Sequence, residues 1–328
     1  MSGCQMGFKR EIPGELAVHL EALQGEALES LQPYHGELRP LLEYALSPGG
    51  KGLRALLFFA AMRVFRPLEL GDRSVALAFE LLHGASLLHD DVVDAARERR
   101  GRPSFHRIWG PERAVLLGDF LYAKASALLM GRASLELMEL FSKMLATMTQ
   151  GELLQSSKAF HWDLEEELYL QILEAKTGSF LGACCQSAGL LAAAAQGLVR
   201  ALEAFGRELG QAFQLQDDAL DYGGQAFQGG KDRGADLRAG RVTLPLILLR
   251  ESLDAKGRKA LLSMPRRGLG PEERSWIWGE IHRKGLVEKA LSRSRASGRR
   301  ALAYLEKLPA GKGREELASL AHLLLGDL

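Results

Sequence analysis

Two matched clusters of aspartates are the residues of this sequence best suited to chemistry. Residues 90–94 read DDVVD, and residues 217–221 read DDALD. Each cluster ends a strongly apolar stretch with helical periodicity, ELLHGASLLHDDVVD in the first case and LGQAFQLQDDALD in the second. Because residues four apart lie on one face of a helix, the first and last aspartate of each cluster should point the same way.

This arrangement favours a bound divalent cation. Like charges four residues apart destabilise a helix, and carboxylates near a helix C-terminus also oppose its dipole. One acidic cluster at a helix end is as often merely solvated, but here the same unfavourable pattern occurs twice. Carboxylate oxygens suit Mg²⁺, which usually shares its ligands with substrate phosphates, and no Cys/His set has the spacing of a zinc site. The predicted magnesium-binding acids are Asp90, Asp91, Asp94, Asp217, Asp218 and Asp221.

Groups that could bind phosphate occur near both clusters. The segment SPGGKGLR is a glycine-rich turn that enters a helix, with Lys51 and Arg54 on one face. It does not match the Walker A pattern, so an ATP-type loop is not supported. Each further candidate, taken singly, is more often a solvated surface charge. These candidates are Arg99 and Arg100 after the first cluster, Lys231 and Arg241 after the second, and Lys176 with Thr177 between them. His83 precedes Asp90 by seven residues and shares its face, although such a histidine is more often a core residue.

The composition describes an ordinary globular protein of 328 residues. Hydrophobic residues make up 47% and charged residues 25%, which excludes a mainly disordered chain. The 42 Lys and Arg against 41 Asp and Glu disfavour a nucleic-acid partner. Three cysteines are no disulfide framework and suit a reducing compartment, so we expect a cytoplasmic protein. The first residues contain no signal-peptide core, and the Gly/Ala-rich stretch 181–199 indicates an interior helix rather than a transmembrane segment.

Helical periodicity dominates the chain, and strand signals are nearly absent. We predict one all-α domain over residues 1–328. The two longest irregular stretches, 95–110 and 223–240, directly follow the acidic clusters, which favours a functional role for both. The predicted helices cover about 15–31, 36–46, 51–65, 72–94, 111–129, 133–157, 163–177, 178–195, 198–222, 241–253, 256–264, 271–283, 285–307 and 311–326.

From about residue 45 to 250 the sequence resembles the trans-type polyprenyl (isoprenyl) diphosphate synthases. The segments that carry the resemblance are GGKGLR, ELLHGASLLHDDVVDAARERRGRPS, LLGDFLYAKA, GELLQ, KTGSF, QLQDDALDY and GKDRGADLRAGRVTLPL. Two DDxxD motifs in this order and context are specific, whereas one alone would be weak. The resemblance implies an antiparallel helical bundle around a central hydrophobic cavity, and a homodimer.

The resemblance also implies roles for individual residues. Asp90, Asp94 and Asp217 would coordinate three Mg²⁺ around an allylic diphosphate, with Asp91, Asp218 and Asp221 as supporting acids. The residues implied for the allylic-diphosphate clamp are Arg99, Lys176, Lys231 and Arg241. Those implied for the isopentenyl-diphosphate pocket are Lys51, Arg54, His83 and Arg100, and those lining the reaction centre are Thr177 and Gln214. Of these, Asp90, Asp94, Asp217, Lys176 and Arg99 would be catalytic.

Two departures from the family pattern affect these expectations. Gly52 stands where the family usually has a basic residue, so a weaker or reshaped isopentenyl-diphosphate pocket is expected. Arg241 stands where lysine is common, which keeps the charge but changes its geometry.

Small residues before the first motif predict a long product. Short-chain members of the family tend to carry bulky aromatics where this chain has Ala85 and Ser86, so a medium- or long-chain product of roughly C30 to C50 is expected. Leu82 and Phe79 would form a deeper floor, aided from a neighbouring helix by Leu128 or Met130. The alternative is that all of these are ordinary core residues.

Three competing functions remain. A terpene cyclase shares the implied fold, but Lys51, Arg54 and the second DDxxD motif argue against it. A regulatory subunit of a heteromeric prenyl synthase would typically lose the aspartates, and only Gly52 points that way. A short-chain farnesyl or geranylgeranyl diphosphate synthase differs only in product length. The main prediction requires that the two acid-tipped helices converge on one diphosphate.

Overall fold

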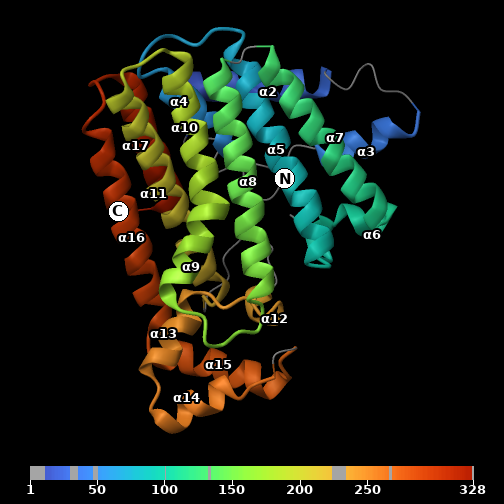
Figure 1. Ribbon diagram of the computed structural model, residues 1–328, viewed down its shortest axis with the longest axis vertical. Helices are drawn as coiled ribbons and strands as arrows, with labels where there is room; N and C mark the ends of the chain where they lie inside the picture. Colours follow the sequence, from blue (N-terminus) through green and yellow to red (C-terminus); the bar gives the residue numbers. More distant parts are fainter. Residues whose placement is uncertain are drawn as a thin grey trace. The chain divides into compact units, whose positions relative to one another are not determined.

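The structure is a computed structural model that describes residues 12–29, 36–46, 51–99, 101–131, 134–223, 234–265 and 268–326 (Figure 1). It confirms the predicted all-α fold class, because the strands in these residues form one two-residue pair. None of the described helices has the length and apolarity needed to cross a membrane.

The elements follow one another along the chain as α2 (Gly14–Glu29), α3 (Leu38–Ala45), α4 (Leu53–Met62), α5 (Asp72–Val93), β1 (Glu98–Arg99), β2 (Arg102–Pro103), α6 (Phe105–Trp109), α7 (Pro111–Met130), α8 (Leu135–Ser157), α9 (Glu166–Leu173), the π-helix η1 (Glu174–Gly178), α10 (Ser179–Leu191), α11 (Gln196–Asp221), α12 (Ala235–Arg238), α13 (Leu244–Ser252), α14 (Ala255–Leu262), α15 (Pro271–Arg283), α16 (Leu286–Leu305) and α17 (Lys312–Leu325).

The predicted helices lie within a few residues of the observed ones, since periodicity and punctuation are local signals. Proline occupies the first position of α7 and of α15, as its fixed φ favours. The two stretches predicted to be irregular contain more structure than expected. The first holds the β1–β2 hairpin and α6, and α12 lies in the second. These elements are too short for periodicity to reveal them.

The chain forms two compact units, each built from segments far apart in the sequence. Unit 1 takes its residues from 1–140, 184–200 and 308–323, and unit 2 from 141–183, 201–307 and 324–328. That the whole chain acts as one domain stays a prediction.

Unit 1 is organised around α4 and α5. Nine of the ten residues of α4 are buried. In unit 1, α5 lies beside α7 (Figure 1), and Gly118 allows this close approach because a Cβ there would overlap the His89 ring. Arg63 pairs with Glu316, its Nε lying 2.8 Å from Oε2, which joins the end of α4 to α17.

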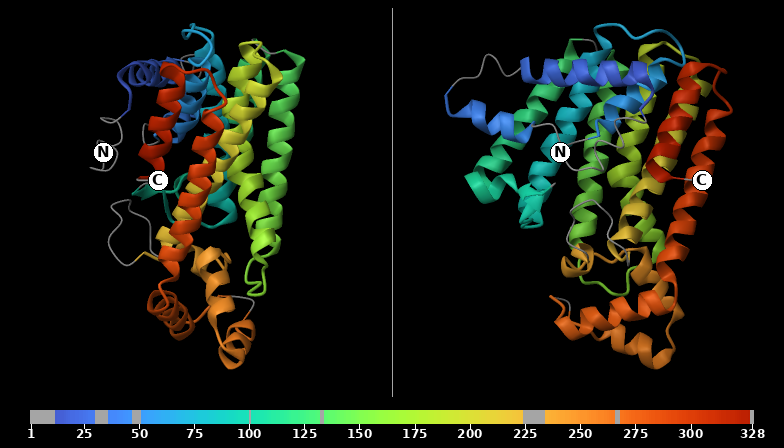
Figure 2. Two further views of the ribbon diagram at one scale, coloured as in Figure 1. Left: turned by 90° about the vertical axis from the view of Figure 1, so that its left-hand side faces the viewer. Right: turned by 180° about the vertical axis from the view of Figure 1, so that it is seen from behind.

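Unit 2 has a separate hydrophobic core. Its buried side chains come from the segment before α9, from α9, and from α11 through α16, and include Trp162, Tyr169, Tyr222, Ile247 and Ile277. Helix α14 packs against α13, and α15 packs against both α13 and α16, in the orange part of Figure 2. This core fixes the C-terminal half of α11, which ends in the second aspartate cluster.

Candidate functional site

The first aspartate cluster ends α5 in unit 1. Asp90 lies on the last turn and is partly buried, and Asp94 caps the helix and is exposed. The backbone N–H of Asp94 donates to the carbonyl of Asp90 at 2.8 Å, so the two residues lie one helical turn apart. The chain leaves the helix at Ala95, whose φ is +49°. Two carboxylates are thus presented from one helix end, as the i,i+4 spacing predicts.

Asp91 has a different environment from its two neighbours. Its side chain is buried, with 3% exposure. One oxygen, Oδ1, accepts from Arg99 Nε at 2.7 Å and Nη2 at 2.6 Å. Such a charge-assisted pair restrains the guanidinium strongly. Asp91 therefore holds Arg99, on β1, in place beside the cluster.

An aromatic group anchors the hairpin that carries Arg99. The Tyr44 hydroxyl on α3 donates to the carbonyl of Pro103 at 2.6 Å, and the guanidinium of Arg102 lies 4.0 Å from the centre of the Tyr44 ring. Trp109 packs edge-on against Tyr44 with ring centres 4.8 Å apart. No motif in the sequence indicated Tyr44, because its partners are some sixty residues away.

Tyr122 on α7 is a second residue that the sequence analysis did not single out. Burial, followed by the carboxylates of Asp90 and Asp119, raises the pKa of its phenol. A neutral phenol close to Asp90 can donate a hydrogen bond. Tyr122 belongs to LLGDFLYAKA, one of the segments that carry the family resemblance. Helical spacing alone does not show which side chain of this segment lies near the aspartates.

Residues 51–54, the described part of the glycine-rich segment, lead into α4. Lys51 is exposed, Arg54 is partly buried, and Glu80 Oε1 accepts from the backbone N–H groups of Arg54 and Ala55, both at 3.1 Å. Glu80, on α5, therefore caps α4 as an N-cap carboxylate would. His83 lies three residues further along α5 and is partly buried. The hydrogen bonds of Glu80 thus connect the start of α4, which carries Lys51 and Arg54, to α5, which carries His83.

Gly52 has a conformation that explains its residue type. Its φ of +62° and ψ of +30° are left-handed, a region that favours glycine. A Cβ at this position would overlap Cδ1 of the buried Leu20. Gly52 therefore packs against α2 at the position where the resemblance led us to expect a basic side chain.

The second aspartate cluster ends α11 in unit 2, and its middle acid is buried. Asp218 Oδ2 accepts from the Tyr169 hydroxyl, and Oδ1 accepts from Gln214 Nε2, both at 2.8 Å. The hydroxyl of Thr177 donates to Gln214 Oε1 at 3.1 Å. A polar chain therefore runs from Thr177 through Gln214 and Asp218 to Tyr169.

Burial, reinforced by the negative charge of Asp236, raises the pKa of Asp218 to about 7, although its two hydrogen-bond donors oppose this shift. Burial and the neighbouring Asp218 also raise the pKa of Tyr169 well above its usual value, so Tyr169 acts as a hydrogen-bond donor. These contacts assign Asp218 to the interior of unit 2.

Replacing Asp218 by asparagine is expected to make the stability of the metal-free protein less dependent on pH. A raised folded-state pKa means that this group's stabilisation is present below about pH 4 and is lost as the pH rises through about 7. The contribution lost between about pH 5.5 and about pH 8 should be about 1–3 kcal/mol. Urea unfolding in EDTA at both pH values measures it, and the same pH dependence in the variant as in the wild type would contradict the assignment.

Asp221 holds the start of α12, which follows the second cluster in the chain. Its two carboxylate oxygens accept from the backbone N–H groups of Ala235 at 3.2 Å and Asp236 at 3.1 Å. Asp236 in turn pairs with Arg241, Nη1 to Oδ1 at 3.0 Å. Asp217 is partly buried and lies one turn before Asp221 on α11. Asp221 and Arg241 are thereby connected through one short segment.

A π-helix carries the remaining predicted residues of unit 2. Short π-helical turns often mark functional sites, and η1 contains both Lys176 and Thr177. The ammonium of Lys176 donates to Gln155 Oε1 and pairs with Glu152. Both partners belong to the GELLQ segment on α8. The GELLQ segment therefore holds Lys176 in place, a role that its residue types alone do not indicate.

Of the predicted site residues, Arg100 and Lys231 lie outside the described residues. The predicted chain-length residues occupy α5: Phe79, Leu82 and Ala85 are buried, and Ser86 is partly buried. Met130 is 71% exposed, so it does not serve as the tunnel floor that the sequence suggested for it in this chain. It is the last residue of α7 and lies off the buried face of that helix, which continues to the completely buried Leu129.

The acidic side chains fit a metal ion that is shared with a substrate. Among the described residues, no group of three or more His, Cys, Asp or Glu side chains gathers closely enough to hold a metal ion. Asp90 and Asp94 nevertheless offer hard oxygen donors from one helix end, which suits Mg²⁺. Because Mg²⁺ usually keeps waters and binds through few carboxylates plus substrate phosphates, this donor set is compatible with it.

The chain is similar to known proteins over most of its length. The polyprenyl synthetase family matches residues 35–273. The chain is 31% identical to octaprenyl diphosphate synthase of Escherichia coli K12 over 94% of this chain and 95% of that one. It is 32% identical to heptaprenyl diphosphate synthase component 2 of Geobacillus stearothermophilus over 93% and 95% of the two chains. A polyprenyl synthase from Caulobacter crescentus, solved with calcium and isoprenyl diphosphate, matches with a TM-score of 0.89 and 31% identity over 97% of this chain and 98% of that one.

Proposed function

The chain belongs to the polyprenyl synthetase family and is a prenyltransferase, and we propose that it condenses isopentenyl diphosphate with an allylic diphosphate to make an all-trans polyprenyl diphosphate. One observation carries this proposal. Two DDxxD motifs, each on a helix end, occur in a chain that is related over nearly its full length to an octaprenyl diphosphate synthase. A terpene cyclase would need neither the second motif nor the glycine-rich turn.

The proposed metal acids are Asp90, Asp94 and Asp217, which would hold Mg²⁺, three ions per active site, around the allylic diphosphate. The bound ions would supply electrostatic stabilisation of the negative charge on the departing diphosphate. The contacts support different roles for the aspartates within each motif. Asp91 positions Arg99, and Asp218 anchors the chain through Gln214 to Thr177, so both act through other side chains.

The proposed diphosphate clamp consists of Arg99, Lys176, Lys231 and Arg241. Arg99 and Arg241 are each restrained by an aspartate, and Lys176 by Glu152 and Gln155. An arginine held in this way loses little further freedom when it binds phosphate bidentately. Lys51, Arg54, His83 and Arg100 would bind the second substrate, isopentenyl diphosphate.

The proposed reaction proceeds in three steps. The carbon–oxygen bond of the allylic diphosphate breaks, and the electron pair leaves with the diphosphate held by the clamp. The double bond of isopentenyl diphosphate then attacks the allylic cation. A proton is finally lost from the new chain, with the departed diphosphate as its acceptor. Apolar side chains would protect the cation from water.

The left-handed turn at Gly52 leads to a specific expectation. Replacing Gly52 by arginine should not tighten isopentenyl-diphosphate binding, because the new Cβ meets Leu20 and the backbone is strained. We expect a loss of about 1–3 kcal/mol in unfolding free energy and an unchanged or higher KM for that substrate. Denaturant unfolding and steady-state kinetics measure both effects.

The double variant Gly52→Arg with Leu20→Ala tests the cause. If the overlap between the new Cβ and Leu20 is the main cause, the double variant should have a lower KM for isopentenyl diphosphate than Gly52→Arg. A single Gly52→Arg variant with normal stability and a lower KM would show that the turn tolerates the usual basic residue.

The proposed product is medium to long, roughly C30 to C50. The relatives named for octaprenyl and heptaprenyl products support this range, as do the small residues Ala85 and Ser86 before the first motif. A short-chain farnesyl or geranylgeranyl product is the alternative. Leu82 and Phe79, buried further along α5, would limit the longest chain.

We also propose a cytoplasmic homodimer. The free, buried thiols of Cys184 and Cys185 fit a reducing compartment. One relative is named as a component of its synthase, so a requirement for a partner subunit is the competing assembly.

The purified chain, supplied with Mg²⁺, farnesyl diphosphate and labelled isopentenyl diphosphate, tests the proposal. Elongated polyprenyl diphosphates extracted and separated by chromatography would support it. A cyclic hydrocarbon would indicate a cyclase. No product from a folded chain would indicate that a partner subunit is required, and EDTA should abolish any elongation.

A further inference from the structure

One segment of this chain has a marked local excess of positive charge. Residues 250–300 contain fourteen Lys and Arg and six Asp and Glu, a formal charge of +8, although the whole chain has 42 against 41. The remaining residues therefore carry a formal charge of −7. An uneven distribution of this kind produces a local field that attracts anionic surfaces even when the net charge is near zero.

Within this segment, α14 presents cations that are not neutralised by neighbours. Lys256, Arg258 and Lys259 are all exposed. Neither lysine forms an ion pair within the described part of the chain. The nearby acid Asp254 is used at the helix start, where it accepts from the backbone N–H of Gly257 at 2.7 Å. The three side chains therefore present a compact positive surface.

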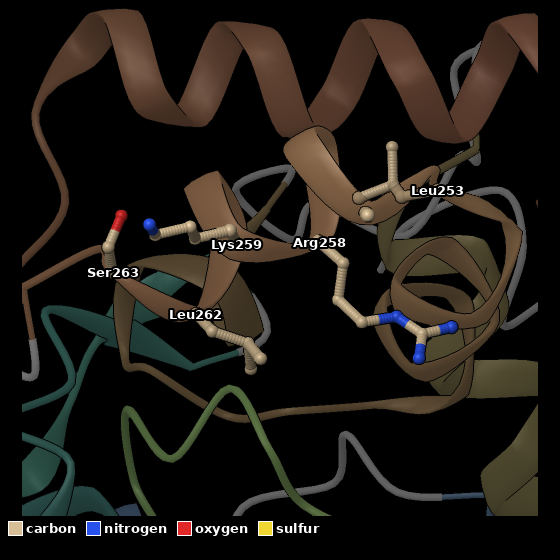
Figure 3. A pocket seen from close by; sticks show the side chains of 6 residues that line it. Leu253, Arg258, Lys259, Leu262 and Ser263 are labelled. Atoms are coloured by element: carbon tan, nitrogen blue, oxygen red, sulfur yellow. The ribbon is translucent and has the colours of Figure 1, made fainter.

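The same surface has an apolar component. Leu262 ends α14 and is 42% exposed. It lines a shallow pocket of about 670 Å³ with Leu253, Ala255, Arg258, Lys259 and Ser263. Figure 3 shows Lys259 directed towards Ser263 on one side of this pocket and Arg258 on the other, with Leu262 below. No carboxylate lines the pocket.

The helix that carries this surface is held firmly in unit 2. Leu261 is completely buried in the unit 2 core, next in sequence to the exposed Leu262. Arg258 Nε donates to the carbonyl of Arg250 on α13 at 3.3 Å. Because one side of α14 is fixed, the cations and Leu262 keep a constant arrangement on the other.

We propose that this face of α14, formed by Lys256, Arg258, Lys259 and Leu262, docks the enzyme on an anionic lipid surface. Cations around an exposed leucine match a bilayer surface, where lipid phosphates meet the acyl chains. A nucleic acid would bind to the cations alone, and its phosphates would make no contact with the apolar pocket. The choice of a lipid partner also rests on the proposed function, since the long apolar tail of a polyprenyl diphosphate is more favourably placed in lipid than in water.

Vesicle binding by the full chain tests this proposal. The protein is mixed with sedimenting vesicles of phosphatidylcholine alone or with phosphatidylglycerol, at low and high salt, and the bound fraction is measured. Binding should require phosphatidylglycerol and weaken at high salt, because exposed charges are screened. The variant Lys256→Glu with Lys259→Glu should bind at least about tenfold more weakly, since each cation near an anionic surface contributes about 1 kcal/mol. Leu262→Ser should also weaken binding.

A matched control changes the net charge equally at two other exposed cations, Arg113→Glu with Lys143→Glu, on α7 and α8. This control should lower binding less than the α14 variant does. An equal loss in both would show a general charge effect and overturn the site. Equal binding to vesicles with and without phosphatidylglycerol would contradict recognition of an anionic lipid surface. Stronger binding to RNA than to vesicles at moderate salt would also contradict it. All variants should keep elongation activity in detergent, so failure of docking is distinguishable from failure of the proposed function.

Discussion

Alanine at Asp90 or at Asp217 is expected to lower turnover by at least about a thousandfold. In the proposed site, each change would remove an oxygen donor from a magnesium ion that would stabilise charge on the departing diphosphate. Both side chains are partly buried at helix ends rather than in a core, so folding should be preserved. Steady-state elongation of labelled isopentenyl diphosphate, together with thermal unfolding, measures the two effects separately.

The control for these variants is Glu139→Ala, which removes an exposed acid from α8. It should leave both turnover and stability nearly unchanged. Asp218→Ala offers a contrast, because it removes the buried partner of Tyr169 and Gln214 and should lower the melting temperature as well. Near-normal rates in Asp90→Ala or in Asp217→Ala would remove that residue from the metal site.

Phenylalanine at Ala85 is expected to shorten the polyprenyl product markedly. The proposed tunnel runs along α5, and a bulky ring one turn before Asp90 would stop the growing chain. Ala85 is completely buried, so the ring also costs about 1–3 kcal/mol of stability through overpacking. Product chromatography on the soluble variant measures the chain-length distribution.

Two further variants separate a tunnel effect from disturbed packing. Ser86→Phe places the ring at a partly buried neighbour and should shorten the product with less loss of stability. Ala76→Phe overpacks a completely buried position on the opposite face of α5. It should destabilise the protein but leave product length unchanged. The same product distribution in all of these proteins would show that α5 does not set chain length.

Helix positions could be predicted from the sequence because their signals are local. The apolar repeat before Asp90 and the prolines that begin α7 and α15 act within a few residues. Tiny elements such as β1, β2 and α6 escaped prediction, since they depend on contacts such as that between Tyr44 and Pro103. Met130 is exposed because it lies off the face of α7 that is buried at Leu121, Ala125 and Leu129.

The sequence by itself determined the helical class of this protein and the placement of each aspartate motif at a helix end, because residue type and spacing along one helix are local properties. Tertiary structure alone decided how the acids in each motif differ. Asp91 is buried against Arg99, and Asp218 is buried against Tyr169, forty-nine residues earlier in the chain. Burial and hydrogen-bond partners arise from segments that meet only after folding, and no spacing within a motif encodes them.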